Sequence, residues 1–251
     1  MTVTRIATST PTDIVVRGKS LCDELIGAVT FTEMIYFQIL GARPTPAQAA
    51  VVDACLVALM EHGLTPSAIA ARLVYGSAPE AMQGAVAAGL LGVGGVFVGT
   101  ALGCARLLDR IVSHPDRRAA CDAIVAEHTA SRTPLPGFGH DTHVPDDPRT
   151  PKLFAVARAH GVAGDRVAAL ELLGAVLDEH KRRHITINAT GAVAACLGDA
   201  GVPAEILRGF ALIARCAGLV GHVHEEQRDP ALRAMWQAAE RAIPYATEGE
   251  P

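Results

Sequence analysis

The 251-residue sequence predicts an all-α protein, and three observations lead to this prediction. Half of the residues are hydrophobic but only 4% are aromatic, and alanine, leucine and glycine dominate, which suits packing between helices better than a β-sheet. Apolar side chains recur at helical spacing along most of the chain. We find no convincing strand pattern, internal repeat or low-complexity tail in the sequence.

Capping and breaking residues set the expected helix boundaries. Pro11 and Gly18 keep residues 1–20 irregular or extended, and Thr30 and Glu33 have the spacing of a capping box for a second helix. Gly63 is a suitable stop for the helix that precedes it. The helices predicted in this way cover, in order, residues 21–40, 47–62, 65–74, 84–108 with a glycine-rich break, 115–131, 152–160, 166–181, 189–198, 204–218 and 229–242.

Residues 136–149, PGFGHDTHVPDDPR, concentrate ionisable side chains in a predicted loop. Gly137 and Gly139 free the backbone to bring the His140 imidazole close to a ligand, and the planar guanidinium of Arg149 suits a carboxylate. The alternative is a solvated, turn-rich surface loop. The prolines that exclude regular structure here are Pro134, Pro136, Pro145, Pro148 and Pro151.

Three further stretches have both a structural and a functional interpretation. His62 ends a helix, where an imidazole is often only a partner of the last carbonyl groups. Arg215 lies in an apolar helix, where an unpaired charge is costly, so it needs an anionic partner or ligand. The run Lys181-Arg182-Arg183 is either a favourable helix cap or a site for the phosphates of a nucleotide-like cofactor.

Several kinds of site and partner are disfavoured. The net charge of −4 with no basic patch argues against nucleic acid. His222 and His224 are two positions apart, so a helix directs them differently, and no metal site is expected. Residues 92–99 are glycine-rich but match neither a P-loop nor a dinucleotide fingerprint.

The expected compartment is the cytoplasm, without membrane contact. The six scattered cysteines form no CxxC pair and indicate reduced thiols, and no signal-peptide pattern opens the sequence. The most apolar window, residues 84–102, is better interpreted as a buried, glycine-rich helix pair than as a membrane span.

Six segments follow one another in a specific order: VRGKSLCDELIGAVTFTEMIYFQILGARPT, EHGLTPSAIAARLV, AVAAGLLGVGG, PGFGHDTHVPDDPR, NATGAVAACLGDAG and ARCAGLVGHVHEEQ. Through them the chain resembles the citrate synthase superfamily, most closely its citryl-CoA lyase branch, which includes the C-terminal module of ATP-citrate lyase. The resemblance implies a citrate synthase-like helical fold and a homodimer or higher homo-oligomer. It also implies a large domain of residues 1–108 and 191–251 and a small mobile domain of residues 109–190.

The implied chemistry is a Claisen or retro-Claisen reaction with a coenzyme A thioester as co-substrate. The expected reaction cleaves a citryl-CoA-type 3-hydroxy-3-carboxyacyl-CoA to acetyl-CoA and an oxaloacetate-like 2-oxo acid, or runs the reverse condensation. The resemblance implies that His62 and His140 polarise the reacting oxygen, and Phe97, where citrate synthases proper keep a histidine, favours the lyase branch. Substrate binding is implied for Arg149, Arg215, Asn188 and, across the dimer, Arg228; CoA phosphate binding is implied for Lys181, Arg182 and Arg183.

One position departs from the family. Thr190 stands where the family keeps the carboxylate that exchanges a proton with the thioester α-carbon, and threonine cannot be the same base. The nearest aspartate along the helix is Asp199, and Asp141 or His143, beside His140, could substitute. A different substrate, or a pseudoenzyme that binds dicarboxylates or CoA without turnover, is the alternative.

Overall fold

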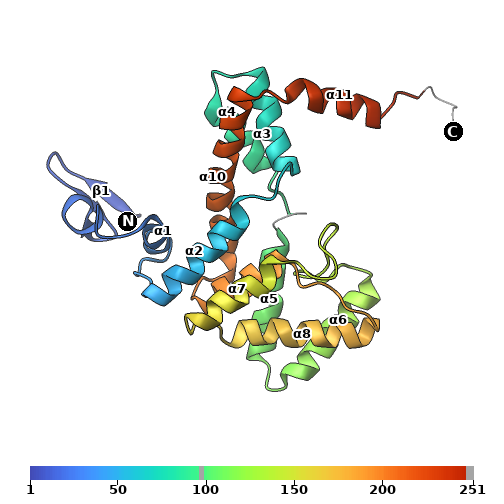
Figure 1. Cartoon of the computed structure of the whole chain (residues 1–251). Coiled ribbons are helices and arrows are strands. Elements are labelled where there is room, and N and C mark those ends of the chain that lie inside the picture. The colour runs from blue at the N-terminus through green and yellow to red at the C-terminus, as the bar shows by residue number, and fades with distance from the viewer. Residues whose placement is uncertain (96–98, 247–251) are drawn as a thin grey trace. The chain divides into compact units, whose positions relative to one another are not determined.

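The computed structural model describes residues 1–95 and 99–246, and the all-α prediction is confirmed (Figure 1). The chain divides into two compact units. Unit 1 comprises Met1–Cys55 and Thr100–Leu207, and unit 2 comprises Leu56–Gly99 and Arg208–Pro251. The predicted large and small domains are defined by their movement relative to each other during catalysis. Their division of the chain therefore stays a prediction.

The N-terminal segment holds three short strands. These are β1 (Ala7–Ser9), β2 (Ile14–Val16) and β3 (Lys19–Ser20), which form an antiparallel sheet in the order β1-β2-β3. Strands of two or three residues are too short for side-chain alternation to reveal them in a sequence.

The predicted helix over residues 21–40 is two elements, a π-helix η1 (Leu21–Leu25) and α1 (Phe31–Leu40). Thr30 caps α1, because its hydroxyl accepts a hydrogen bond from the Glu33 amide at 3.2 Å. The Glu33 carboxylate in turn accepts from the Thr30 amide at 2.7 Å. The predicted capping box is therefore confirmed.

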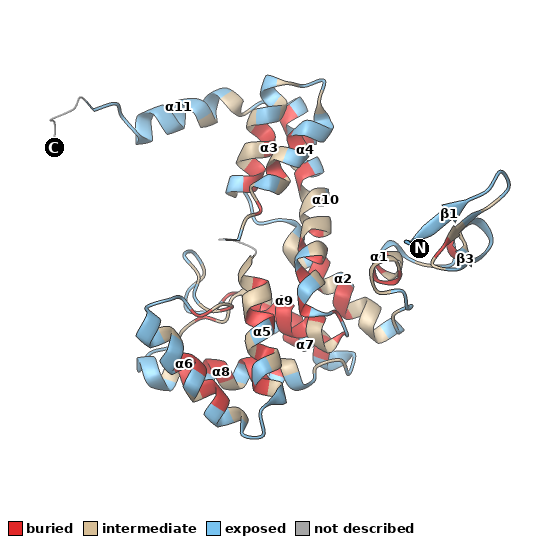
Figure 2. Ribbon diagram, turned by 180° about the vertical axis from the view of Figure 1, so that it is seen from behind, coloured by how far each residue is buried: buried red, intermediate tan, exposed pale blue. Residues whose placement is uncertain are grey.

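Unit 1 is built around a buried central helix. Besides α1, its helices are α5 (Gly99–Ser113), α6 (Arg117–Ser131), α7 (Arg149–Ala159), α8 (Asp165–Lys181), α9 (Ala189–Asp199) and the greater part of α2 (Pro46–Met60). Every residue from Gly191 to Leu197 is buried, and α9 packs against α7 and α8 (Figure 2). The small side chains of α9 let its neighbours approach closely.

The start of α7 corrects one prediction. The helix begins at Arg149 rather than at residue 152, so Pro151 lies in its first turn. The first turn of a helix has backbone amides without an intrahelical acceptor, and proline, which has no amide hydrogen, is tolerated there. The sequence suggested that Pro151 belongs to the loop, but it lies within α7.

Asp199, at the end of α9, fixes the start of α8. Its carboxylate accepts hydrogen bonds from the amides of Gly164, Arg166 and Val167 at 2.7, 3.0 and 3.0 Å. These are amides that the first turn of α8 leaves without an intrahelical acceptor. The aspartate nearest to Thr190 along the helix is thus committed to the fold.

Unit 2 contains α3 (Pro66–Ser77), α4 (Met82–Leu91), nearly all of α10 (Leu207–Arg228) and α11 (Leu232–Ala242). α10 follows a short 3-10 helix, η2 (Ala204–Ile206), and does not end at Gly218 as predicted. A Cβ at Gly218 would lie 2.2 Å from the carbonyl oxygen of Met60. This glycine therefore permits close contact between α10 and the end of α2 rather than stopping a helix.

One helical run in the described part of the chain, Ala204–Arg228, is long and apolar enough to cross a membrane by length and composition alone. Core helices of soluble proteins meet the same criterion, so this is weak evidence. The window of residues 84–102 is divided between α4 and α5, which confirms two helices, but the predicted burial is wrong for α4, where only Ala85 and Gly89 are buried and Leu91 is 86% exposed.

Candidate active site

Backbone hydrogen bonds join the GFGH segment to the start of α9 within unit 1. The Gly139 amide donates to the Thr186 carbonyl at 2.8 Å, and the Asn188 amide donates to the Gly137 carbonyl at 3.0 Å. Two segments that are far apart in the sequence are thereby paired. This pairing brings His140 to the N-terminal end of α9.

Gly137 and Gly191 make that pairing sterically possible. Gly137 has a φ of +89°, and a Cβ on it would lie 2.6 Å from the Cys104 sulfur. A Cβ on Gly191 would lie 2.6 Å from the Gly137 carbonyl oxygen. Only glycine allows the loop backbone to rest directly on the first turn of α9.

A buried carboxylate that the sequence analysis did not single out holds Arg149. Asp147 is 0% exposed and accepts hydrogen bonds from Nε and Nη2 of Arg149 at 2.9 and 2.8 Å. It also accepts from the Ala189 amide, at the start of α9, at 2.9 Å. Burial alone would raise the pKa of Asp147, but these hydrogen bonds and the Arg149 charge hold the pKa at about 2. Asp147 is therefore ionised at neutral pH and fixes the guanidinium in place.

The His140 ring is oriented by its own loop. Its Nδ1 accepts hydrogen bonds from the amides of Thr142 and His143, both at 3.0 Å, so the neutral ring carries its proton on Nε2. Burial lowers the pKa of His140, and nearby His143 and Arg149 lower it further, which favours the neutral ring. Nε2 lies 3.5 Å from Nη2 of Arg149. Two N–H donors thus lie side by side, as a carbonyl or carboxylate oxygen requires.

Thr190 belongs to a chain of neutral hydrogen-bonding groups. Its hydroxyl donates to Oδ1 of Asn188 at 2.6 Å and lies 3.2 Å from the Thr100 hydroxyl. Because the Thr190 proton is used on Asn188, the Thr100 hydroxyl is the donor of the second bond. Asn188 also caps α9 through the Gly191 amide, and its Nδ2 donates to the Gly139 carbonyl. Its side chain supports the local structure, and the substrate contact implied for Asn188 stays a prediction.

His184 connects the end of α8 to the loop. Its Nδ1 lies 2.7 Å from the Asp178 carboxylate, and its Nε2 lies 2.9 Å from the Asp146 carboxylate. Hydrogen bonds to Asp178 and Asp146 raise the pKa of His184. The ring therefore acts as a bridge that is strongest when it is protonated.

In unit 2, Glu61 organises the surroundings of two predicted residues. Its Oε1 accepts hydrogen bonds from the amides of His62 and Gly63 at 2.8 and 2.7 Å. Its Oε2 lies 3.1 Å from Nε2 of His222, and its Oε1 lies 3.9 Å from Nη1 of Arg215. Burial raises the pKa of Glu61, but the bonds from His222 and the two amides outweigh burial and lower it. Glu61 is thus an anionic neighbour of Arg215. The sequence analysis named Arg215 but not this partner.

Glu226, in the HVHEE motif, has a structural role. It is buried, accepts from Nε of Arg72 at 2.7 Å, and accepts from the amides of Ala231 and Leu232 at 2.7 and 2.9 Å. The buried ion pair ties α3 to α10 and caps the start of α11.

The remaining predicted residues are exposed or lie outside the described residues. Lys181, Arg182 and Arg183 are exposed at the end of α8, and Arg228 is exposed at the end of α10. Their contacts with CoA phosphates and across a dimer stay predictions. Phe97 lies outside the described residues.

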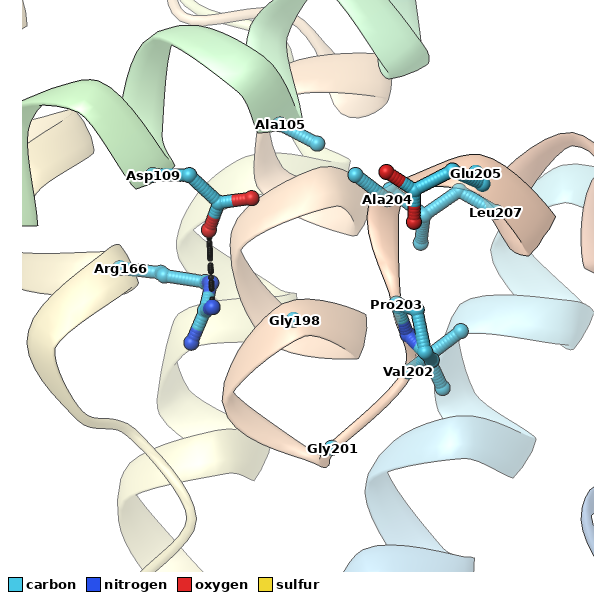
Figure 3. A pocket seen from close by; sticks show the side chains of 10 residues that line it. All are labelled: Ala105, Asp109, Arg166, Gly198, Gly201, Val202, Pro203, Ala204, Glu205 and Leu207. Atoms are coloured by element: carbon cyan, nitrogen blue, oxygen red, sulfur yellow. Dashed lines mark hydrogen bonds and ion pairs between the residues drawn. The ribbon is translucent and has the colours of Figure 1, made fainter. Parts of the chain in front are cut away.

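A cavity of about 370 Å³ lies at the opposite end of α9 from Thr190 (Figure 3). Asp109 and Arg166 lie on its wall, and Nε of Arg166 donates to Asp109 at 2.9 Å. None of the residues predicted for the site lines this cavity. The candidate site is instead the N-terminal end of α9 with the loop that carries His140 and Arg149.

Comparison with protein families and curated proteins gives two findings. The family described as citrate synthase, C-terminal domain, matches residues 4–235. The chain is 29% identical over 194 residues to proteins named "Putative citrate synthase 2" from Mycobacterium tuberculosis and Mycobacterium bovis. The match covers 74% of this chain and 50% of those proteins, so the chain spans about half the length of these curated relatives.

Three solved structures illustrate the structural similarity. Citryl-CoA lyase from Hydrogenobacter thermophilus is 30% identical with a TM-score of 0.89, over 100% of this chain and 96% of that one. A mutant ATP citrate lyase from Methanosaeta concilii, in complex with (3S)-citryl-CoA, is 20% identical with a TM-score of 0.80, over 99% of this chain and 42% of that one. Citrate synthase from Thermotoga maritima is 20% identical with a TM-score of 0.69, over 89% of this chain and 58% of that one.

Proposed function

The chain belongs to the citrate synthase family, and from this membership we propose that it is a carbon–carbon lyase of the citryl-CoA lyase type. The proposed reaction is the retro-Claisen cleavage of citryl-CoA, or of a similar 3-hydroxy-3-carboxyacyl-CoA, to acetyl-CoA and an oxaloacetate-like 2-oxo acid. The same residues would serve the reverse condensation.

One observation carries this proposal: Nε2 of His140 and Nη2 of Arg149 lie 3.5 Å apart, and Asp147 fixes the guanidinium. The Nε2 proton of His140 is available to an oxygen that changes between hydroxyl and carbonyl during cleavage. Arg149 offers a charged donor to the carboxylate next to that oxygen. Donors held rigidly before the substrate arrives need no reorganisation during the reaction.

The other predicted residues complete the proposed site. His62 is assigned to the same oxygen as His140, and Arg215 to a second carboxylate. Lys181, Arg182 and Arg183 are assigned to CoA phosphates, which their exposed positive charges suit. Arg228 is assigned to substrate across a homodimer. A closing movement that excludes water would protect the reacting thioester from hydrolysis.

The test follows all CoA species by mass spectrometry. Purified protein is incubated with citryl-CoA and, separately, with acetyl-CoA plus oxaloacetate. We expect acetyl-CoA release from citryl-CoA, and we expect His140→Ala to abolish it. Exposed His160, which is at the end of α7, supplies a matched control, and His160→Ala should retain full activity. Absence of turnover by the unmodified protein contradicts the proposal.

Thr190 favours a second candidate function, a pseudoenzyme that binds dicarboxylates or CoA. Its hydroxyl is bonded to Asn188 and Thr100 and has no carboxylate chemistry. In that case citrate or oxaloacetate should raise the melting temperature without any turnover. Activity gained by Thr190→Asp, from a protein that had none, would support this alternative.

A further inference from the structure

We propose that His143 is the residue that transfers a proton between the substrate hydroxyl and the thioester α-carbon. This inference rests on the proposed function and names the residue that serves in place of the carboxylate absent at Thr190.

Thr190 and its partners cannot take up a proton. The Thr100 hydroxyl donates to Thr190, and Thr190 donates to the Asn188 amide oxygen. These hydrogen bonds all run in one direction and end on the side-chain amide oxygen of Asn188, which also accepts from the backbone amide of Gly191. None of these groups is basic at neutral pH, so the proton must be exchanged elsewhere.

The aspartates of the loop and of α9 either bind other groups or are exposed to water. Asp147 is fully buried against Arg149, and Asp146 is paired with His184. Asp199 binds three amides at the start of α8. Asp141 is exposed, so it serves as the alternative that the test below must separate from His143.

The His143 ring lies against the proposed oxygen-binding group. Its centroid is 4.4 Å from that of the His140 ring, with the two planes tilted by 41°, and the residue is half-buried. The His143 amide donates to Nδ1 of His140 at 3.0 Å, which fixes the backbone of one histidine to the ring of the other. An imidazole can accept and return a proton near neutral pH, whereas the His140 ring is held as an N–H donor.

The proton balance needs no additional reactant. Neutral His143 removes the proton from the substrate hydroxyl, the new carbonyl forms as the carbon–carbon bond breaks, and the electron pair passes to the thioester as an enolate. The His143 imidazolium then gives its proton to the enolate α-carbon, which produces acetyl-CoA and restores the neutral ring. His140 donates to the same oxygen throughout and does not change its protonation.

The test compares His143→Gln with Asp141→Asn in citryl-CoA cleavage. We expect His143→Gln to lower kcat by at least about 100-fold while KM changes less than about threefold, and Asp141→Asn to retain kcat. In D2O with oxaloacetate present, the unmodified protein should exchange the acetyl-CoA methyl protons for deuterium, and His143→Gln should lose that exchange. His143→Asn, with a confirmed native melting temperature, guards against a folding defect of the first variant.

The outcomes separate the two proposals. If the unmodified protein does not turn over citryl-CoA, the proposed function fails, and this inference fails with it. If the unmodified protein cleaves citryl-CoA and both His143 variants retain its rate, only this inference is overturned. A loss confined to Asp141→Asn would also overturn it and would transfer the role to that carboxylate.

Discussion

At the scale of single residues, Asp147 determines the position of the Arg149 guanidinium. The sequence DDPR offers two adjacent aspartates, and nothing in their spacing distinguishes them. In the fold, Asp146 is exposed and pairs with His184, whereas Asp147 is fully buried and binds Arg149. Burial decides which of the two aspartates binds Arg149, and this burial depends on the pairing of the loop with the start of α9. A sequence without its fold could therefore nominate Arg149 but not the group that holds it.

Asp147→Asn should lower both stability and activity. The substitution leaves the Arg149 guanidinium, whose side chain is 25% exposed, without its buried counter-charge, and we expect the free energy of unfolding to fall by about 1–3 kcal/mol. Urea denaturation monitored by circular dichroism measures this loss. Exposed Asp165, which pairs with Arg117 at 2.9 Å, provides the control, and Asp165→Asn should cost less than about 1 kcal/mol. Equal costs for the two variants would contradict a special role for Asp147.

The pKa of Asp147 predicts how stability depends on acid. The carboxyl has a pKa of about 2 in the folded chain and about 3.9 in an unfolded one. A lowered pKa contributes stability above the unfolded value and loses it as the pH falls toward the folded value. The unmodified protein should therefore be more stable than Asp147→Asn at pH 4. This difference in the free energy of unfolding should become smaller as the pH falls to about 2, in urea titrations at each pH. A gap that is constant over this range would refute the assignment.

At the scale of secondary-structure elements, the helices were predictable and their contacts were not. Apolar spacing located α8 and α9 within a residue, because this signal acts over a few neighbouring positions. Gly218 and Pro151 were misjudged for a common reason. Gly218 serves a contact with Met60, and Pro151 occupies a first turn, so each depends on surroundings that local sequence does not report.

Gly191→Ala should separate the loop from α9. Its Cβ would lie 2.6 Å from the Gly137 carbonyl oxygen, and neither backbone can move without breaking the pairing that positions His140. We expect a loss of about 1–3 kcal/mol in thermal or urea unfolding, together with loss of activity. Gly221, inside α10 with nothing within 4 Å of its Cβ position, is the control. Gly221→Ala should raise stability by up to about 1 kcal/mol, and a similar loss in both variants would contradict the prediction.

His184 makes the attachment of the loop to α8 dependent on pH. Its pKa is raised in the folded chain, so its contribution is complete below the unfolded value of about 6.5 and is lost as the pH rises through the folded value. Hydrogen exchange of the loop amides should therefore accelerate, beyond the intrinsic effect of pH, as His184 deprotonates. His184→Gln should remove that extra acceleration. Retention of the same pH response in the variant would assign it to another group.

At the scale of the whole molecule, the order of the six segments identified the family, whereas the proposed reaction depends on a few positions within them. Family segments carry the fold because many residues share that task, and the match to residues 4–235 confirms it. The helix α9, which carries Thr190, keeps an Asn188 cap and a buried core, so the fold does not depend on a carboxylate at that position. Similarity over the chain therefore predicts the architecture well and the reaction less directly, since a reaction depends on a few atoms.

The helix α11 carries an apolar face that is suited to self-association. Met235, Trp236 and Ala239 recur at helical spacing on one face of α11, beyond Leu232, whose side chain lies against Gly76 of α3. This helix contains no buried residue, and Trp236 is 60% exposed. We expect a second copy of the chain to cover this face in the proposed homodimer, because water contact with such a face is unfavourable. Trp236 is the only tryptophan, so its fluorescence reports on this face directly.

On dilution, the emission of Trp236 should shift to longer wavelength as the sedimentation coefficient falls, since both would follow dissociation. Met235→Glu places a charge on the apolar face and should move dissociation to higher protein concentration. Gln237→Glu, on the other side of α11, adds the same charge and should leave dissociation unchanged. A sedimentation coefficient that falls while the emission of Trp236 stays constant would show that the dimer forms through another surface.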